Sequence, residues 1–385
     1  MKAKAILILA LIATPAVAQE NLQRQVKDTQ SEKTFTTVKA LPITSVKNQW
    51  RSGTCWAYGT LGFLESEILR QTGKTCDLCE MFVVNKDYMD NATHYVRMHG
   101  FSQISEGGSC DDVLDVIRTH GICPEDAMPA PGSLVGDSLA NFTRFFPEFE
   151  ATVRRAILPE GMDANDVRKA TQAATAIGAA PRSHWRDTVQ AVIDRNVGRC
   201  PDTFTYEGRT YTPQSFARSL GIDPDNYVSL TSFLHHPFRQ WFVIEAPYKW
   251  RLRPSYNIPV DELMQTIDHA LDAGYTVAWG GDVSGGLTAK GTAELPDGIR
   301  PTQQQRQEQW DDWRFTYDHV MLIYGKATDE QGRPYYMVKN TWGNVGPYRG
   351  VWYMSRDYMA LYTTYIFLNR RALPKTLRRA VTTSK

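Results

Sequence analysis

Apolar residues change their spacing along the chain, from helical in the front half to strand-like in the rear half. Leucine and isoleucine recur at helical spacing over 54–71, which a Thr-Gly stop signal follows. The stretch 109–120 predicts a second helix, with a serine cap, acidic residues in its first turn and a glycine after its end. The charged stretch 142–196 is mostly helical in pattern, and 259–273 predicts a further amphipathic helix.

The rear half predicts short strands. Residues 275–279 form an apolar run that is typical of a buried strand. Four more β-rich runs, divided by Gly, Asp and Asn, follow at 319–324, 335–340, 350–354 and 364–368. A helical front and a strand-rich rear predict an α+β protein with its active site between the two halves.

The first residues predict export. A short positive start precedes an apolar run, 5–12, that is too short to span a bilayer. Ala16-Val17-Ala18 then matches the small-x-small pattern that signal peptidase cuts, so the mature chain is expected to begin at Gln19. We therefore expect a periplasmic or secreted protein with no membrane segment after signal cleavage. Residues 19–40 are polar and are interpreted as a flexible leader.

Charge and composition exclude some classes of partner. The 385 residues hold 43 basic and 42 acidic side chains, a net charge of +1. This balance gives no support for nucleic-acid binding, and the short basic end is interpreted as a solvated tail. No metal or organic cofactor is expected, and the sequence leaves the oligomeric state open.

Six cysteines in an exported chain predict disulfide chemistry. If Cys55 is a catalytic thiol, five remain, so they cannot all pair within the chain. We expect at least one disulfide, with the pairing left open among Cys76, Cys79, Cys110, Cys123 and Cys200.

The stretch around Cys55 carries candidate chemistry. A cysteine in the first turn of a helix faces backbone N–H groups and the positive end of the helix dipole, which favour a nucleophilic thiolate. Gly53 allows a substrate carbonyl to approach closely, and Gln49 can offer its amide to a developing oxyanion. By itself, a cysteine in such a loop is more often structural.

Two further motifs supply the partners that such a cysteine needs. His319 begins an apolar strand, and Asn340 follows 21 residues later in Lys-Asn-Thr-Trp-Gly. The imidazole can take the thiol proton and later protonate the leaving amine. The Asn340 amide oxygen can hold the other ring nitrogen, and Trp342 could cover that hydrogen bond.

Together these motifs resemble those of papain-like cysteine peptidases. The resemblance implies oxyanion stabilisation by Gln49, attack by Cys55, acid–base chemistry by His319 and orientation by Asn340. Glu106-Gly107-Gly108 resembles the paired glycines of that family, which implies that Gly107 and Gly108 bind substrate backbone. It also implies the two-lobed papain-like fold, with peptide or protein substrates.

The bleomycin hydrolase and aminopeptidase C branch is the more similar one. His319 lies 264 residues after Cys55, whereas papain-type enzymes have about 130–150 residues there, so the chain carries a large helical insertion. The predicted organisation is a signal peptide (1–18), a flexible leader (19–40), a helical lobe with the nucleophile (41–130), a mainly helical insertion (131–255), a β-rich lobe with His and Asn (256–372) and a basic tail (373–385).

The chain departs from the family pattern in three places. Ser52 stands where papain has a disulfide cysteine, so that bridge is absent. Leu78-Cys79-Glu80 replaces a Leu-Ser-Glu run, and creates a Cys-x-x-Cys pattern without the context of a redox motif. In bleomycin hydrolases a C-terminal arm enters the cleft, but here the end is short and basic. We therefore expect an enzyme that is not a strict single-residue aminopeptidase, with the insertion able to block the cleft instead.

The leading hypothesis is hydrolysis of peptide bonds through a thioester on Cys55. Alternatives with the same triad are an activity restricted to the amino terminus, an acyl transferase and an amidase. A non-catalytic peptide-binding module is the alternative of another class. The retention of Cys55, His319, Asn340 and Gln49 together argues against it.

Overall fold

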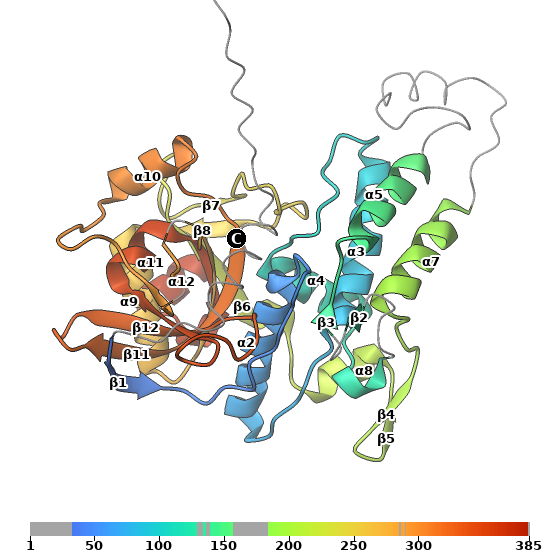
Figure 1. Ribbon diagram of the computed structural model, residues 1–385, viewed down its shortest axis with the longest axis horizontal. Helices are drawn as coiled ribbons and strands as arrows, with labels where there is room; N and C mark the ends of the chain where they lie inside the picture. The colour runs from blue at the N-terminus through green and yellow to red at the C-terminus, as the bar shows by residue number, and fades with distance from the viewer. Residues whose placement is uncertain are drawn as a thin grey trace, which may run out of the picture.

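Two lobes flank one central helix, α2 (Cys55–Thr72), which separates a helical lobe from a β-rich lobe (Figure 1). The computed structural model describes residues 33–128, 134–135, 139–156, 184–284, 286–288 and 290–383. The predicted signal peptide and the leader up to residue 32 lie outside the described residues and stay predictions. In the part of the chain that is described, no helix is both long enough and apolar enough to cross a membrane.

The helical lobe lies on one side of α2, where its helices α3 and α4 pack directly on α2 and the others pack on these two. Its helices are α3 (Glu80–Arg97), α4 (Cys110–His120), α5 (Phe145–Ala156), α7 (Trp185–Val197) and α8 (Pro213–Ser219). Two small strand pairs complete it, β2 (Leu134–Val135) with β3 (Leu139–Ala140), and β4 (Phe204–Tyr206) with β5 (Arg209–Tyr211). The predictions for 54–71 and 109–120 are confirmed, and the latter helix begins with a capping box between Ser109 and Asp112.

The β-rich lobe is built on one ten-stranded sheet with the order β10-β13-β12-β11-β9-β14-β6-β8-β7, in which β1 pairs with β11. The strands are β1 (Phe35–Ala40), β6 (Tyr227–Thr231), β7 (Trp241–Phe242), β8 (Ser255–Asn257), β9 (Val277–Gly281), β10 (Thr292–Ala293), β11 (His319–Asp329), β12 (Pro334–Lys339), β13 (Val351–Ser355) and β14 (Thr363–Asn369). The five strands predicted in the rear half are confirmed, with shifted ends.

Helices α9 (Val260–Asp272), α11 (Arg356–Tyr362) and α12 (Lys375–Thr383) cover the side of this sheet that faces away from α2. Helix α10 (Gln303–Asp311) instead places Trp310 and Arg306 against Phe233 and Phe315 of the other core. Apolar residues of α9, α11 and α12 form one core with this face of the sheet. A second core joins the opposite face to α2 and the helical lobe.

Strand β11 divides these two cores, because successive side chains of a strand point to opposite faces. Val320 and Leu322 belong to the core shared with α2, whereas Met321 and Ile323 belong to the core under α9. Helix α2 comes very close to β11, since a Cβ on Gly59 would lie 2.8 Å from Val320 Cγ1. Glycine at position 59 therefore allows the helix that starts at Cys55 to lie directly on the strand that starts at His319.

Three predicted segments differ in the structure. The last residues of the expected flexible leader form β1, an edge strand that sequence periodicity does not reveal because most of its side chains are exposed. The expected basic tail forms α12, in which Leu377 and Val381, four residues apart, are both buried. The predicted insertion is not a separate helical unit, because its last part supplies β6, β7 and the start of β8 to the main sheet.

Candidate active site

Cys55 is the first residue of α2, and its thiol is almost buried, with 8% of the residue exposed. The backbone N–H groups of Val320 and Trp56 are near enough to the sulfur to favour its thiolate form. Thr54 makes no side-chain cap, and no acidic residue lies in the first turn of α2. The start of this helix is therefore free to stabilise negative charge at Cys55.

His319 is held by Asn340. The His319 Nε2 atom lies 2.7 Å from Asn340 Oδ1, which also accepts a hydrogen bond of 2.7 Å from the backbone N–H of Thr341. The second contact identifies Oδ1 as an acceptor, so His319 Nε2 must carry the proton and Nδ1 keeps its lone pair. Trp342 is buried beside the imidazole, with ring centroids 5.0 Å apart. Asn340 thus fixes one tautomer, and Trp342 shields the hydrogen bond from water.

Burial disfavours the charged form of each candidate catalytic group. It raises the pKa of the Cys55 thiol to about 12, although the two backbone hydrogen bonds oppose this shift. It lowers the pKa of His319 to about 4, against a weaker opposing effect of Asn340. Burial thus opposes the effect of the helix start and of the nearby N–H groups, and the expected thiolate stays a prediction.

Asp318, the residue before His319, is tied to the segment that follows β9. Its carboxyl group is buried and accepts a hydrogen bond of 2.9 Å from the backbone N–H of Val283. Burial, together with the charge of Asp282, raises the pKa of Asp318 well above its usual range.

Gln49 joins the two halves of the candidate site. Its side chain is fully buried, with Nε2 donating to the Ser52 carbonyl at 2.7 Å and Oε1 accepting from the Thr341 hydroxyl. Its backbone N–H also donates to the Thr341 carbonyl at 2.8 Å. Because an amide nitrogen carries two hydrogens, one N–H of Gln49 remains for a developing oxyanion.

Ser52 replaces the missing disulfide with hydrogen bonds. Its hydroxyl donates to the Gln49 carbonyl at 2.6 Å and lies 2.6 Å from Thr54 Oγ1. These contacts hold the turn between Gln49 and Cys55 in one shape without a covalent bridge.

Gly107 and Gly108 lie close to two aromatic rings. A Cβ on Gly107 would lie 2.9 Å from the Tyr248 ring, and one on Gly108 would lie 2.8 Å from the Trp56 indole. The Gly107 N–H already donates to Ser105, and the Gly108 carbonyl already accepts from a tyrosine hydroxyl. Glycine is thus required at both positions for packing, and the predicted role in binding substrate backbone stays a prediction.

Sequence reasoning missed two residues beside this site, Glu106 and Tyr248. Glu106 precedes the paired glycines, and its carboxylate accepts a hydrogen bond of 2.5 Å from the backbone N–H of Gly53. The Glu-Gly-Gly motif drew attention to the glycines, although the acidic residue was its chemically reactive member. Tyr248 belongs to no motif, so only the folded chain places it over Gly107.

All six cysteines are free thiols in the structure, which contradicts the expected disulfide. Five of the six are buried, and all but Cys55 lie in or against the core of the helical lobe, where a thiol packs as a small apolar group. Cys79 and Cys123 are neighbours, since their side chains form a hydrogen bond and the Cys79 N–H donates to the Cys123 carbonyl at 3.1 Å. The Cys-x-x-Cys pattern of Cys76 and Cys79 is therefore part of a reduced core.

One cluster outside the site has the composition of a metal centre. Ligand atoms of His235, His236 and Glu245 lie within 4.8 Å of one another. However, the Gln307 amide accepts from the Leu234 N–H through its oxygen, so its nitrogen donates to His235 Nδ1 at 2.9 Å. The lone pair of His235 Nδ1 is therefore used by Gln307, and Nε2 carries the proton, which it donates to Glu245. Neither ring nitrogen of His235 then has a free lone pair for a metal.

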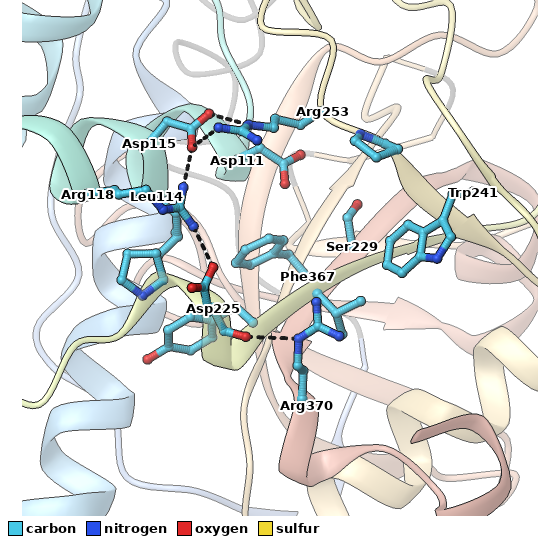
Figure 2. Close-up of a pocket in the computed structure, with 14 residues that line it drawn as sticks. Asp111, Leu114, Asp115, Arg118, Asp225, Ser229, Trp241, Arg253, Phe367 and Arg370 are labelled. Carbon is cyan, nitrogen blue, oxygen red and sulfur yellow. Dashed lines mark hydrogen bonds and ion pairs between the residues drawn. The ribbon is translucent and has the colours of Figure 1, made fainter. Parts of the chain in front are cut away.

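A pocket of about 460 Å³ lies between α4 and strands β6, β7 and β14 (Figure 2). Its charged walls are already paired, with Arg253 and Arg118 on Asp115 and Arg118 also on Asp225. None of the candidate catalytic residues lines it. The pocket is therefore separate from the site at Cys55.

Most of the chain is similar to known proteins. Residues 76–385 match the Peptidase C1-like family. Aminopeptidase C of Lactobacillus delbrueckii subsp. lactis is 21% identical over 383 residues, covering 87% of this chain and 82% of that protein. Aminopeptidase C of Listeria monocytogenes is 22% identical over 383 residues, covering 86% and 81%. The crystal structure of pepw from Lactobacillus rhamnosis superposes with a TM-score of 0.71 at 18% identity, covering 96% of this chain and 92% of that one.

The family match and the candidate site overlap only in part. The match includes His319, Asn340 and the paired glycines, but it starts after Gln49 and Cys55. The assignment of these two residues therefore rests on their position in the structure.

Proposed function

Because the chain belongs to the peptidase C1-like family of cysteine-type peptidases, we propose that it hydrolyses peptide bonds through a thioester on Cys55. His319 moves the proton, Asn340 holds the imidazole and Gln49 stabilises the oxyanion. The α+β papain-like fold expected from the sequence is confirmed. Peptides or proteins are accordingly the substrates of the family to which the chain belongs.

One observation carries this proposal. Helix α2 lies directly on β11 at Gly59, so that the thiol of Cys55 receives the N–H of Val320, the residue that follows His319. At the same time, Asn340 leaves the Nδ1 atom of His319 with a free lone pair. A thiol and a proton acceptor at the ends of two adjoining elements are what nucleophilic catalysis requires.

The chemical steps follow from these contacts. His319 Nδ1 takes the proton of the Cys55 thiol, and the thiolate attacks the substrate carbonyl. The backbone N–H groups at the start of α2 and the second N–H of Gln49 stabilise the resulting oxyanion. The imidazolium then gives its proton to the leaving amine, which leaves a thioester on Cys55. A water molecule, deprotonated by His319, hydrolyses the thioester and restores the thiol.

Mass spectrometry of the products from a mixed peptide library tests this function. We expect pairs of shorter peptides whose summed mass exceeds that of the substrate by one water molecule. The same experiment tests the acyl-transferase alternative, because added amines would then appear covalently bound in the products. Binding of peptides without any cleavage would instead favour the non-catalytic module.

Replacing Gln49 should slow the reaction without stopping it. We expect Gln49→Ala to lower kcat by roughly 10²–10³, the usual loss for one oxyanion donor. KM should change little, because the oxyanion forms only after binding. Gln304→Ala, on an exposed turn of α10, is the matched control and should be as fast as wild type. A Gln49→Ala enzyme at full speed would mean that other groups hold the oxyanion.

A further inference from the structure

A strap of residues 246–253, between β7 and β8, is fastened across the helical lobe beside the candidate site. Three basic residues at alternating positions anchor it to aspartates of α3 and α4. The pairs are Lys249 with Asp111 at 2.5 Å, Arg251 with Asp87 at 2.7 Å and with Asp90 at 3.0 Å, and Arg253 with Asp115 at 2.6 Å. Figure 2 shows the last of these pairs. Since Lys249 and Arg251 are mostly buried, the strap is held in one position.

The strap places Tyr248 over the paired glycines. The Tyr248 ring covers Gly107 so closely that a Cβ there would lie 2.9 Å from it, and it packs edge-on to Tyr317 with centroids 5.9 Å apart. Burial raises the pKa of Tyr248, and its closeness to the ionisable groups of Cys55, Asp318 and Glu106 adds to this shift. Tyr248 therefore lies among the groups of the candidate site and leaves no space for a side chain at position 107.

Glu106 supplies an acidic group beneath this aromatic wall. One carboxylate oxygen accepts from the Gly53 N–H, two residues before Cys55. The Glu106 carbonyl receives hydrogen bonds from the Trp56 indole and the Tyr88 hydroxyl, both at 3.1 Å, which fix the backbone. No described basic side chain forms an ion pair with Glu106, and burial raises its pKa to about 7. The Glu106 carboxyl group is therefore buried without a cationic partner among the described residues.

We propose that Glu106 binds the free α-ammonium group of the peptide substrate, and that Tyr248 stops the chain there. This inference rests on the proposed function. The second carboxylate oxygen has no partner among the described residues, and a charge-assisted hydrogen bond from an ammonium would satisfy it. The C-terminal segment is not needed for this recognition, since α12 packs into the core on the other side of the sheet. The activity is thereby directed to the amino ends of peptides.

Three internally quenched peptides of one sequence test the proposal. One has a free amino terminus, one is acetylated, and one is acetylated but carries lysine as its first residue. We expect the wild-type enzyme to cleave the free peptide roughly 10- to 100-fold faster than either acetylated peptide, as kcat/KM. Equal rates on the free and acetylated peptides would overturn the proposal, and rescue by the lysine would assign Glu106 to a side-chain amine instead.

Variants then assign the effect to the named residues. Glu106→Gln keeps the acceptor for the Gly53 N–H but removes the charge, so it should cleave the free peptide as slowly as the acetylated one. Glu207→Gln, an exposed acid at the β4–β5 turn, is the matched control and should retain the wild-type ratio. Tyr248→Ala should raise cleavage of the acetylated peptide. A wild-type ratio in Glu106→Gln contradicts the inference.

Two further measurements separate folding and function from recognition. The rate at which an epoxide alkylates Cys55 reports whether Glu106→Gln is folded. If that variant does not fold, the wild-type comparison of free and acetylated peptides still decides. Activity that persists in Cys55→Ala would refute the proposed function, whereas an unchanged ratio in an active Glu106→Gln enzyme would refute the inference alone.

Discussion

Cys55→Ala should reduce peptide hydrolysis to background, a loss of about 10⁵-fold or more, because no other described group can form the acyl-enzyme. The fold should be retained, since alanine suits the start of α2 and leaves the contact of Gly59 with Val320 intact. The measurement is kcat with a peptide that the wild-type enzyme cleaves, together with circular dichroism.

The control for this prediction is whether labelling and loss of activity are confined to Cys55. A thiol-directed epoxide should label Cys55 alone, although Cys200 is the more exposed thiol. Cys200→Ala is the matched variant, because this partly exposed thiol lies outside the candidate site and should not matter for turnover. Label on Cys200 or Cys79, with activity surviving in Cys55→Ala, would contradict the assignment.

His319→Ala should be almost as damaging as loss of the nucleophile, because the two residues act as a unit. Burial holds the pKa of Cys55 at about 12, so the thiol depends on His319 for deprotonation at neutral pH. Asn340→Ala should have a milder effect, since Asn340 orients the ring without exchanging protons. The ordered series of kcat values for the three variants is the measurement.

The pH profile adds a test of the same assignment. Only the neutral imidazole can accept the thiol proton, and burial lowers the pKa of His319 to about 4. The wild-type kcat/KM should therefore hold from neutral pH down to about 5 and fall as the pH drops through about 4. In Asn340→Ala the ring would lose the partner that favours its charged form, so the acid limb should move to lower pH. A limb near the ordinary histidine pKa of 6.5 would indicate an exposed imidazole.

Segments whose own residues determine their structure could be predicted from the sequence. The helix that starts at Cys55 and the strand that starts at His319 have clear apolar periods, and the triad has distinctive neighbours. Strand β1 could not be predicted, because an edge strand with exposed side chains is held mainly by backbone hydrogen bonds to β11. Its Phe35 ring stacks on Tyr353, at a centroid distance of 3.9 Å, a contact with a residue more than 300 positions away.

The position of the strap and the pKa of the Cys55 thiol could not be predicted from the sequence, for a related reason. Lys249, Arg251 and Arg253 look like a solvated basic run until α3 and α4 bring aspartates to them. Cys55 at a helix start suggests a low pKa, but burial by the surrounding core has the larger effect. Both depend on long-range packing, which local patterns do not encode.

Thr341 contacts both residues that support catalysis, Gln49 and Asn340. Its hydroxyl holds the Gln49 side chain, while its backbone N–H holds the Asn340 oxygen that positions His319. Gln49 belongs to the chain leading into α2, and Asn340 follows a strand of the opposite lobe. Because both contacts run through Thr341, a displacement of this residue would move the oxyanion donor and the imidazole together. The distance between these two groups would thereby be kept.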